Sequence, residues 1–254
     1  MDIDAYRAHP REQVRITSLL EMVPENVTTV LDVGARDGYL SRKLADRGLV
    51  VTALDLTRPA FNDPRIACIQ GDATALRLPD RAFDLVLCAE VLEHVPVPGL
   101  QQACRELQRV ASHYILVGVP YQQDIRVGRL TCHACGGVSP PWGHVNQFNK
   151  ESLQALFADS IAQRIELVGE RGPDTNALST RLMDWAGNPW ASYGQDEPCV
   201  HCGDRFLPPP PPTLKDRVLA RVSLEVGRLR GRQHSQKGNW IHGLYARSKS
   251  SDGL

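Results

Sequence analysis

The sequence predicts an α/β fold in which a wound β-sheet is covered by helices. Between residues 29 and 120, short apolar segments alternate with amphipathic ones, which is the order of strands and helices in such a sheet. A glycine-containing turn follows the first apolar segment, and acidic residues end the next ones. Because open α/β sheets bind ligands at the carboxyl ends of their strands, these residues predict a nucleotide-like ligand there.

The most informative segment is VLDVGARDGYL, residues 30–40. It predicts a strand, a tight turn containing Gly34 and Gly38, and the start of a helix at Leu40. The turn lacks the G-x-G-x-x-G pattern of dinucleotide-binding proteins, and no G-K-S/T sequence of a phosphate-binding loop follows. A turn with two glycines would also suit an ordinary strand-to-helix connection, so the following strands must decide between the two interpretations.

Acidic residues end three of the predicted strands. Asp55 ends the strand at 50–56, and a carboxylate at that place can accept hydrogen bonds from both hydroxyls of a ribose. Asp72 follows the third strand, and Glu90 ends the fourth. Each acid alone could be a solvated residue at a strand end. Their ordered occurrence at successive strands favours a common ligand site.

These segments together resemble the class I S-adenosylmethionine-dependent methyltransferases, and in particular their type 11 group. The resemblance rests on LDVGARDG (31–38), LDL (54–56), GDATALRLP (71–79) and FDLVLCAEVLEHV (83–95). It extends from residue 29 to about 168. It implies a Rossmann-like, seven-stranded methyltransferase sheet, with a closing strand near the C-terminus at 240–247.

The resemblance also implies where S-adenosylmethionine, the methyl donor, would bind. The turn would contact the methionine end, Asp55 the ribose and Asp72 with Ala73 the adenine, while Ala89 and Glu90 would border the sulfonium. The donor-binding residues implied in this way are Asp32, Gly34, Ala35, Gly38, Asp55, Leu56, Asp72, Ala73, Ala89 and Glu90.

Arg36 departs from the family pattern, which usually has glycine at this place in the turn. The arginine removes a permissive backbone position and adds a cation. Because a guanidinium beside a sulfonium would be repelled, we expect the side chain of Arg36 to point outward.

Four of the seven cysteines form two Cys-x-x-Cys-Gly motifs, at 132–136 and 199–203. Two such motifs supply the four thiolates of a closed structural zinc site. Disulfides or a redox pair are the alternatives, and a reducing cytosol disfavours the disulfides. The predicted zinc ligands are Cys132, Cys135, Cys199 and Cys202, which leave no open position for catalysis. We expect the other three cysteines to be small buried residues.

The chain is expected to have four parts. These are an N-terminal cap helix (1–28, helical over 10–23), a donor-binding methyltransferase core (29–169) that includes the first zinc knuckle (131–137), a second knuckle with a proline-rich spacer (170–212), and a basic amphipathic helix with the closing strand (213–254). Trp185 and Trp190 are expected to be packing anchors. The basic helix has three interpretations: a solvated helix packed on the domain, a helix on a membrane surface, or a segment that binds RNA phosphates.

Composition excludes some classes of protein. Lys and Arg total 29, as do Asp and Glu, so there is no general basic field and nucleic acid is not an expected partner. No apolar run approaches the ~20 residues that cross a bilayer, and the first residues lack the layout of a signal peptide. We expect a cytoplasmic protein, and the membrane-surface interpretation of residues 213–230 would place it peripherally at the inner face of the membrane. The sequence does not predict an oligomeric state.

His94 and His144 are the candidate general bases. His94 follows the fourth strand, and His144 precedes the helix after the fifth. Each could instead cap or hydrogen-bond a loop. The favoured function is O-methylation of a sugar, a glycan or a related small polar metabolite. The alternatives are an RNA or protein methyltransferase that recognises its substrate through the zinc module, and a non-catalytic protein that binds S-adenosylmethionine.

Overall fold

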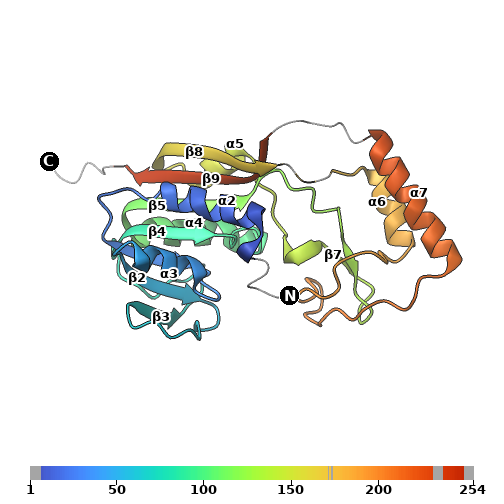
Figure 1. Ribbon diagram of the computed structural model, residues 1–254, viewed down its shortest axis with the longest axis horizontal. Helices are drawn as coiled ribbons and strands as arrows, with labels where there is room; N and C mark the ends of the chain where they lie inside the picture. The colour runs from blue at the N-terminus through green and yellow to red at the C-terminus, as the bar shows by residue number, and fades with distance from the viewer. Residues whose placement is uncertain (1–6, 171, 173, 231–236, 249–254) are drawn as a thin grey trace.

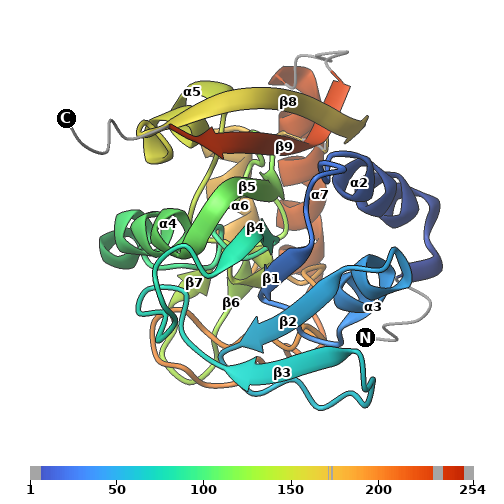
Figure 2. The same ribbon diagram turned by 90° about the vertical axis from the view of Figure 1, so that its left-hand side faces the viewer.

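The computed structural model describes residues 7–170, 172, 174–230 and 237–248, and its centre is a seven-stranded β-sheet (Figure 1). The strands lie in the order β3-β2-β1-β4-β5-β9-β8, and β9 runs antiparallel to both β5 and β8 (Figure 2). The strands are β1 (Thr29–Val33), β2 (Val50–Asp55), β3 (Ile66–Gln70), β4 (Phe83–Ala89), β5 (Ala111–Pro120), β8 (Ser160–Glu170) and β9 (Lys237–Arg247). The predicted α/β class and the seven-stranded sheet with a late closing strand are therefore confirmed.

Helices cover both faces of this sheet. They are α2 (Pro10–Glu21), α3 (Tyr39–Asp46), α4 (Val97–Val110) and α5 (Lys150–Leu156), and a pair outside the sheet consists of α6 (Ala177–Trp185) and α7 (Leu214–Arg230). One apolar cluster joins α2 and α3 to one face, and a second joins α4 and α5 to the other. The central strand β1 is buried on both sides, which explains its continuous apolar sequence.

Helix α2 lies where the sequence predicted a cap helix. His9 caps its first turn by accepting from the Arg11 N–H, and Pro10 suits the first helical position. Leu19 and Met22 pack against the sheet. Val14 is 52% exposed, because the buried face of the helix instead includes the polar residues Glu12 and Arg15.

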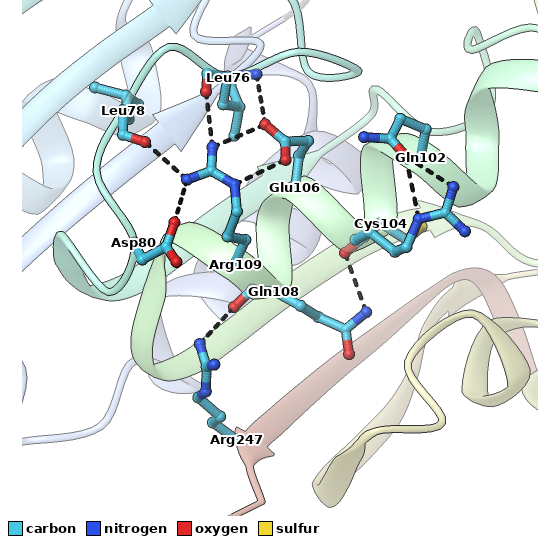
Figure 3. A network of polar contacts seen from close by, with 10 residues as sticks. Leu76, Leu78, Asp80, Gln102, Cys104, Glu106, Gln108, Arg109 and Arg247 are labelled. Carbon is cyan, nitrogen blue, oxygen red and sulfur yellow. Dashed lines mark hydrogen bonds and ion pairs between the residues drawn. The ribbon is translucent and has the colours of Figure 1, made fainter. Parts of the chain in front are cut away.

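Arg109 of α4 holds the segment that follows β3 (Figure 3). Its guanidinium donates to the carbonyl oxygens of Leu76 and Leu78, at 2.7 and 2.8 Å, and to the carboxylate of Asp80 at 2.6 Å. Glu106, one turn earlier, binds Arg109 and also accepts from the Leu76 N–H at 2.8 Å. The network therefore fixes the loop that leaves the carboxyl end of β3.

Two long segments, 121–149 and 186–213, form a smaller unit beyond the carboxyl ends of the parallel strands (Figure 1). The first contains the short antiparallel pair β6 (Leu130–Thr131) and β7 (Val138–Ser139). Helices α6 and α7, which precede and follow the second segment, pack on each other, and Ser179 and Ser223 exchange hydrogen bonds of 2.7 Å between their hydroxyl and carbonyl groups.

The larger apolar residues of α7 lie outside its buried face. Ala220 and Ser223 are buried, whereas Leu214, Val218 and Val222 are 79%, 53% and 44% exposed. Small residues allow the close approach to α6, so the buried face follows size rather than hydrophobicity. Contact of residues 213–230 with a membrane stays a prediction. Within the described residues, no helix combines the length and the apolar character needed to cross a bilayer.

The expectation for the two tryptophans was wrong. Trp185 is 71% exposed and Trp190 is 50% exposed, so neither anchors the unit. A separate apolar cluster fills its interior instead and consists of Leu130, Cys132, Tyr193, Cys199 and Phe206.

Candidate functional site

The turn between β1 and α3 requires its glycines. Gly34 and Gly38 have φ values of +79° and +72°, in the left-handed region that favours glycine. A Cβ atom at Gly34 would lie 2.2 Å from Val91, and one at Gly38 would lie 2.2 Å from Phe61. The N–H groups of Gly34 and Ala35 donate to the Leu54 carbonyl at 2.8 and 3.0 Å, which ties the turn to β2.

Asp32 lies under this turn with 2% exposure. Its carboxylate accepts from the Ser41 hydroxyl at 2.5 Å, and burial raises its pKa to about 6. The group is therefore mostly ionised at neutral pH. A buried carboxylate at the wall of a cavity can pair with a cationic ligand group, which would offset its desolvation.

A first cavity of about 570 Å³ lies over the ends of β1, β2 and β3, and we call it the donor cavity. Asp55 and Leu56 line it, and Leu56 is 68% exposed. Ala73 also lines it. Asp72 is exposed beside the cavity, where its Oδ1 accepts from the N–H and the hydroxyl of Thr74, both at 2.8 Å.

A second cavity of about 360 Å³ adjoins the first, and we call it the acceptor cavity. The two meet beside the end of β4, because they share Gly34, Arg36, Glu90, His94, Asp196 and Glu197. Ala89 lines the acceptor cavity as well. A ligand could therefore pass its reactive end from one cavity to the other beside Glu90 and His94.

Glu90 is held in a strained conformation at this junction. Its φ is +57°, and its N–H donates to the Gly118 carbonyl at 2.8 Å. The Trp240 indole donates to Glu90 Oε2 at 3.1 Å, whereas Oε1 is buried and has no hydrogen-bond partner within the described residues. Burial raises the pKa of this carboxyl. Strain of this kind often occurs at functional sites.

The structure brings the two predicted histidines together. The rings of His94 and His144 meet edge to face, with 4.7 Å between their centroids. Asn146 causes this meeting, because its side-chain amide donates to the carbonyls of Leu92 and Val95 at 2.8 and 2.6 Å. The loop after β5 is thereby fastened to the loop after β4.

Both histidines line the acceptor cavity, where burial favours the neutral imidazole. Burial lowers the pKa of His94, and burial together with His94 lowers that of His144 to about 3. His144 Nδ1 lies 2.5 Å from Gln123 Oε1. Because that oxygen can only accept, Nδ1 carries the proton, and Nε2 of His144 is left as an acceptor.

Glu93 lies beneath these histidines with 0% exposure. Neither of its carboxylate oxygens has a hydrogen-bond partner within the described residues, and burial, followed by the charge of Glu90, raises its pKa well above the ordinary value. Burial therefore favours the protonated form of this carboxyl.

The four predicted zinc ligands form one cluster. Cys132 Sγ lies 3.7 Å from Cys202 Sγ, and Cys135 Sγ lies 3.8 Å from Cys199 Sγ. All four sulfur atoms lie within 4.8 Å of one another. Sulfur atoms of a zinc tetrahedron with bonds of about 2.3 Å would be separated by roughly 3.8 Å, so the cluster has the size that zinc requires.

The surroundings of the sulfur atoms also suit thiolates. The N–H groups of Gly137 and His201 lie 3.4 Å from the sulfurs of Cys135 and Cys199. Gly136 and Gly203, which follow the second cysteine of each motif, have φ values of +71° and +78°. The glycines therefore permit the tight turn that the sequence predicted.

Several residues of the acceptor cavity were missed by the sequence analysis. Arg7 and Arg15 reach it from the α2 side and bind the buried Glu12, at 2.6 and 2.5 Å. Trp142 follows the first knuckle and lines the opposite wall. The Pro-Pro-Trp-Gly sequence just before His144 is the sequence feature that could have indicated that Trp142 lies at the site.

The segment 195–197, which precedes the second knuckle, is the other part of the wall that was missed. Only its polarity and its nearness to Cys199 could have indicated a role. Because both knuckles continue into wall segments, the cysteine cluster positions one side of the acceptor cavity.

Comparison with known proteins agrees with this geometry. Residues 31–113 match the family described as a methyltransferase domain. The chain is 36% identical over 110 residues to the ubiquinone biosynthesis O-methyltransferase of Xylella fastidiosa (strain 9a5c), covering 39% of this chain and 45% of that protein. It is 34% identical over 111 residues to the enzyme of the same name from Azotobacter vinelandii, covering 39% and 47%. The chain thus spans less than half the length of these curated relatives.

Solved structures share the fold. A SAM-dependent methyltransferase from Archaeoglobus fulgidus has a TM-score of 0.55 and 13% identity, with 97% of this chain and 100% of that chain covered. The methyltransferase from Haloferax volcanii, solved in complex with the Trm112 activator, has a TM-score of 0.53 and 14% identity, with 97% of each chain covered. At these identities the likeness concerns the fold alone.

Proposed function

We propose that this chain, which carries a class I S-adenosylmethionine-dependent methyltransferase domain, methylates a hydroxyl group of a small polar acceptor, such as a sugar or a glycan. The observation that carries this proposal is the junction of the two cavities beside Glu90, with a neutral histidine pair on the acceptor side. The donor site and a candidate proton acceptor therefore both face the junction beside Glu90.

The donor cavity suits the adenosyl part of S-adenosylmethionine. Asp55 keeps one carboxylate oxygen for ribose hydroxyls, because only Oδ2 is used by the Arg36 N–H. Leu56 offers an exposed apolar side chain for the adenine face, and Ala73 lies at the cavity wall. The methionine end would extend into the adjoining acceptor cavity, where Asp32 would pair with its ammonium and Arg7 and Arg15 would attract its carboxylate. Asp72 must turn away from Thr74 to reach the adenine.

The acceptor cavity favours a ligand rich in hydroxyl groups. Trp142 offers an aromatic face, and Gln195, Asp196 and Glu197 offer oxygen atoms that accept hydrogen bonds from hydroxyls. The names of the curated relatives also indicate methylation at oxygen. These features support a sugar or a related small metabolite.

The reaction needs alignment and removal of one proton. S-adenosylmethionine supplies a methyl group bound to its sulfonium sulfur, and the demethylated donor leaves as a neutral thioether. His144 Nε2 would take the proton of the acceptor hydroxyl as the oxygen bonds to the methyl carbon, and His94 would hold the His144 ring in place. Zinc bound by the four thiolates would be structural, because no ligand position remains open.

A methyl-transfer assay tests this function. Protein incubated with S-adenosylmethionine labelled in its methyl group is expected to label a hydroxyl-bearing compound from a panel of sugars, glycans and nucleosides. The product should be stable to mild base, because an ether resists hydrolysis that would cleave a carboxyl methyl ester. Label in RNA or protein would favour that alternative, and donor binding without transfer to any acceptor would favour a non-catalytic protein.

A further inference from the structure

We propose that Arg36 and Asp196 are a positioning pair, which holds the segment 195–197 over the acceptor cavity and couples this wall to the donor-binding turn. This inference rests on the proposed function, because that function assigns the two cavities to a donor and an acceptor. The contact between Arg36 and Asp196 does not depend on which acceptor binds. It also explains why an arginine occupies a position in the turn that would suit glycine.

The backbone of Arg36 is strained in a way that orients the turn. Its φ of +47° lies in the left-handed region, which is unfavourable for a residue with a Cβ. The N–H of Arg36 donates to Asp55 Oδ2 at 2.8 Å. This hydrogen bond fixes one carboxylate oxygen of the residue assigned to the ribose. A glycine could adopt the same backbone without strain, so the side chain must supply the reason for the arginine.

The side chain of Arg36 reaches across the site. Its Nη2 lies 3.2 Å from Asp196 Oδ2, and both residues line both cavities. Their side chains are 51% and 66% exposed, and exposed ion pairs add little to overall stability. The pair is therefore suited to position a loop rather than to stabilise the fold. The side chain turns toward Asp196 and remains half exposed.

The segment 195–197 is held on its other side by the knuckle loops. The Trp142 N–H donates to Gln195 Oε1 at 2.8 Å, and Gln195 Nε2 donates to the Glu197 carbonyl at 3.2 Å. Cys199 of the cysteine cluster follows two residues later. Arg36 thus links the donor turn to a wall that is otherwise positioned by the smaller unit.

Amide hydrogen exchange tests this pairing in the full chain. Arg36→Gly and Asp196→Asn are each expected to speed exchange at residues 194–198 about two- to five-fold, the range expected for loss of an exposed ion pair. The double variant should show no further increase, and Arg36→Lys should restore slow exchange because it keeps the charge. Arg65→Ala, which breaks the exposed pair with Asp46 and a second pair with Asp63 elsewhere on the surface, is the control. Saturating S-adenosylhomocysteine should slow exchange at 194–198 in the unaltered chain and have little effect there in Arg36→Gly.

Unchanged exchange at 194–198 in both single variants, or additive effects in the double variant, would overturn the pairing. A chain that binds S-adenosylhomocysteine without protecting this segment would overturn the coupling and leave the proposed function intact. A chain that does not bind S-adenosylhomocysteine would instead contradict the proposed function. The exchange rates of the free variants would still decide whether the pair exists.

Discussion

Replacing Cys199 with serine is expected to lower methyl transfer more than a hundredfold while the sheet stays folded. Structural zinc sites contribute about 10–16 kcal/mol in small zinc domains, so losing one of four ligands should disorder the smaller unit. That unit has a small apolar cluster of its own, which includes Cys132 and Cys199 themselves. Trp142 and the segment 195–197 would then no longer form one wall of the acceptor cavity.

Metal content, circular dichroism and initial rates measure this effect together. The unaltered chain should hold one zinc ion, and Cys199→Ser should lose it with little change in helix and strand content. Donor affinity should fall only a few-fold, because the donor cavity is built mainly from β1, β2 and β3 and their loops. Cys68→Ala is the control, since Cys68 lies in β3 away from the cluster. Full activity of a zinc-free protein would contradict the assigned role of the cluster.

Replacing His144 with glutamine is expected to lower kcat by about 10²–10⁴, the usual contribution of a general base. Glutamine keeps a similar size and can still hydrogen-bond Gln123, so the affinity for S-adenosylhomocysteine should not change. Because the pKa of His144 is lowered to about 3, its neutral form predominates at every pH above that value. A rate that falls as the pH is lowered through about 6 would therefore reflect protonation of Asp32, whose pKa is raised to about 6, and not protonation of His144.

Kinetic assays of matched variants separate the two histidines. His94→Gln should lower kcat less than His144→Gln if His94 only positions the other ring. His113→Gln is the control, because this histidine is exposed at the far end of β5. If both variants of the cavity histidines keep full kcat, neither residue is the base. If only His94→Gln loses activity, the roles must be exchanged.

The fold could be predicted from sequence because its signals are local. Each central parallel strand is a short apolar run that a turn or an acid ends, and the required glycines at 34 and 38 stand in the sequence itself. The cysteine cluster was also predictable, because ligand type and the two-residue spacing specify it. These features do not depend on how distant segments pack.

The acceptor wall could not be predicted, because it depends on contacts between distant segments. Asn146 joins two loops by donating to backbone carbonyls, and every residue has such a carbonyl, so the sequence does not indicate which ones it binds. Arg7 reaches the cavity from the start of the chain, and Asp196 reaches it from the second knuckle. The partner of α7 could not be predicted for a related reason: its packing on α6 uses the small residues Ala220 and Ser223 and leaves its larger apolar residues exposed.

The central claim is that the ends of β1, β2 and β3 bind the adenosyl donor, and calorimetric titration with S-adenosylhomocysteine tests it most directly. The unaltered chain should bind one equivalent, and Asp55→Asn should weaken binding at least tenfold, because the charged acceptor for the ribose hydroxyls is lost. A folded chain that gives no binding heat and no thermal shift with this ligand, or an Asp55→Asn variant that binds as tightly as the unaltered chain, would contradict the claim.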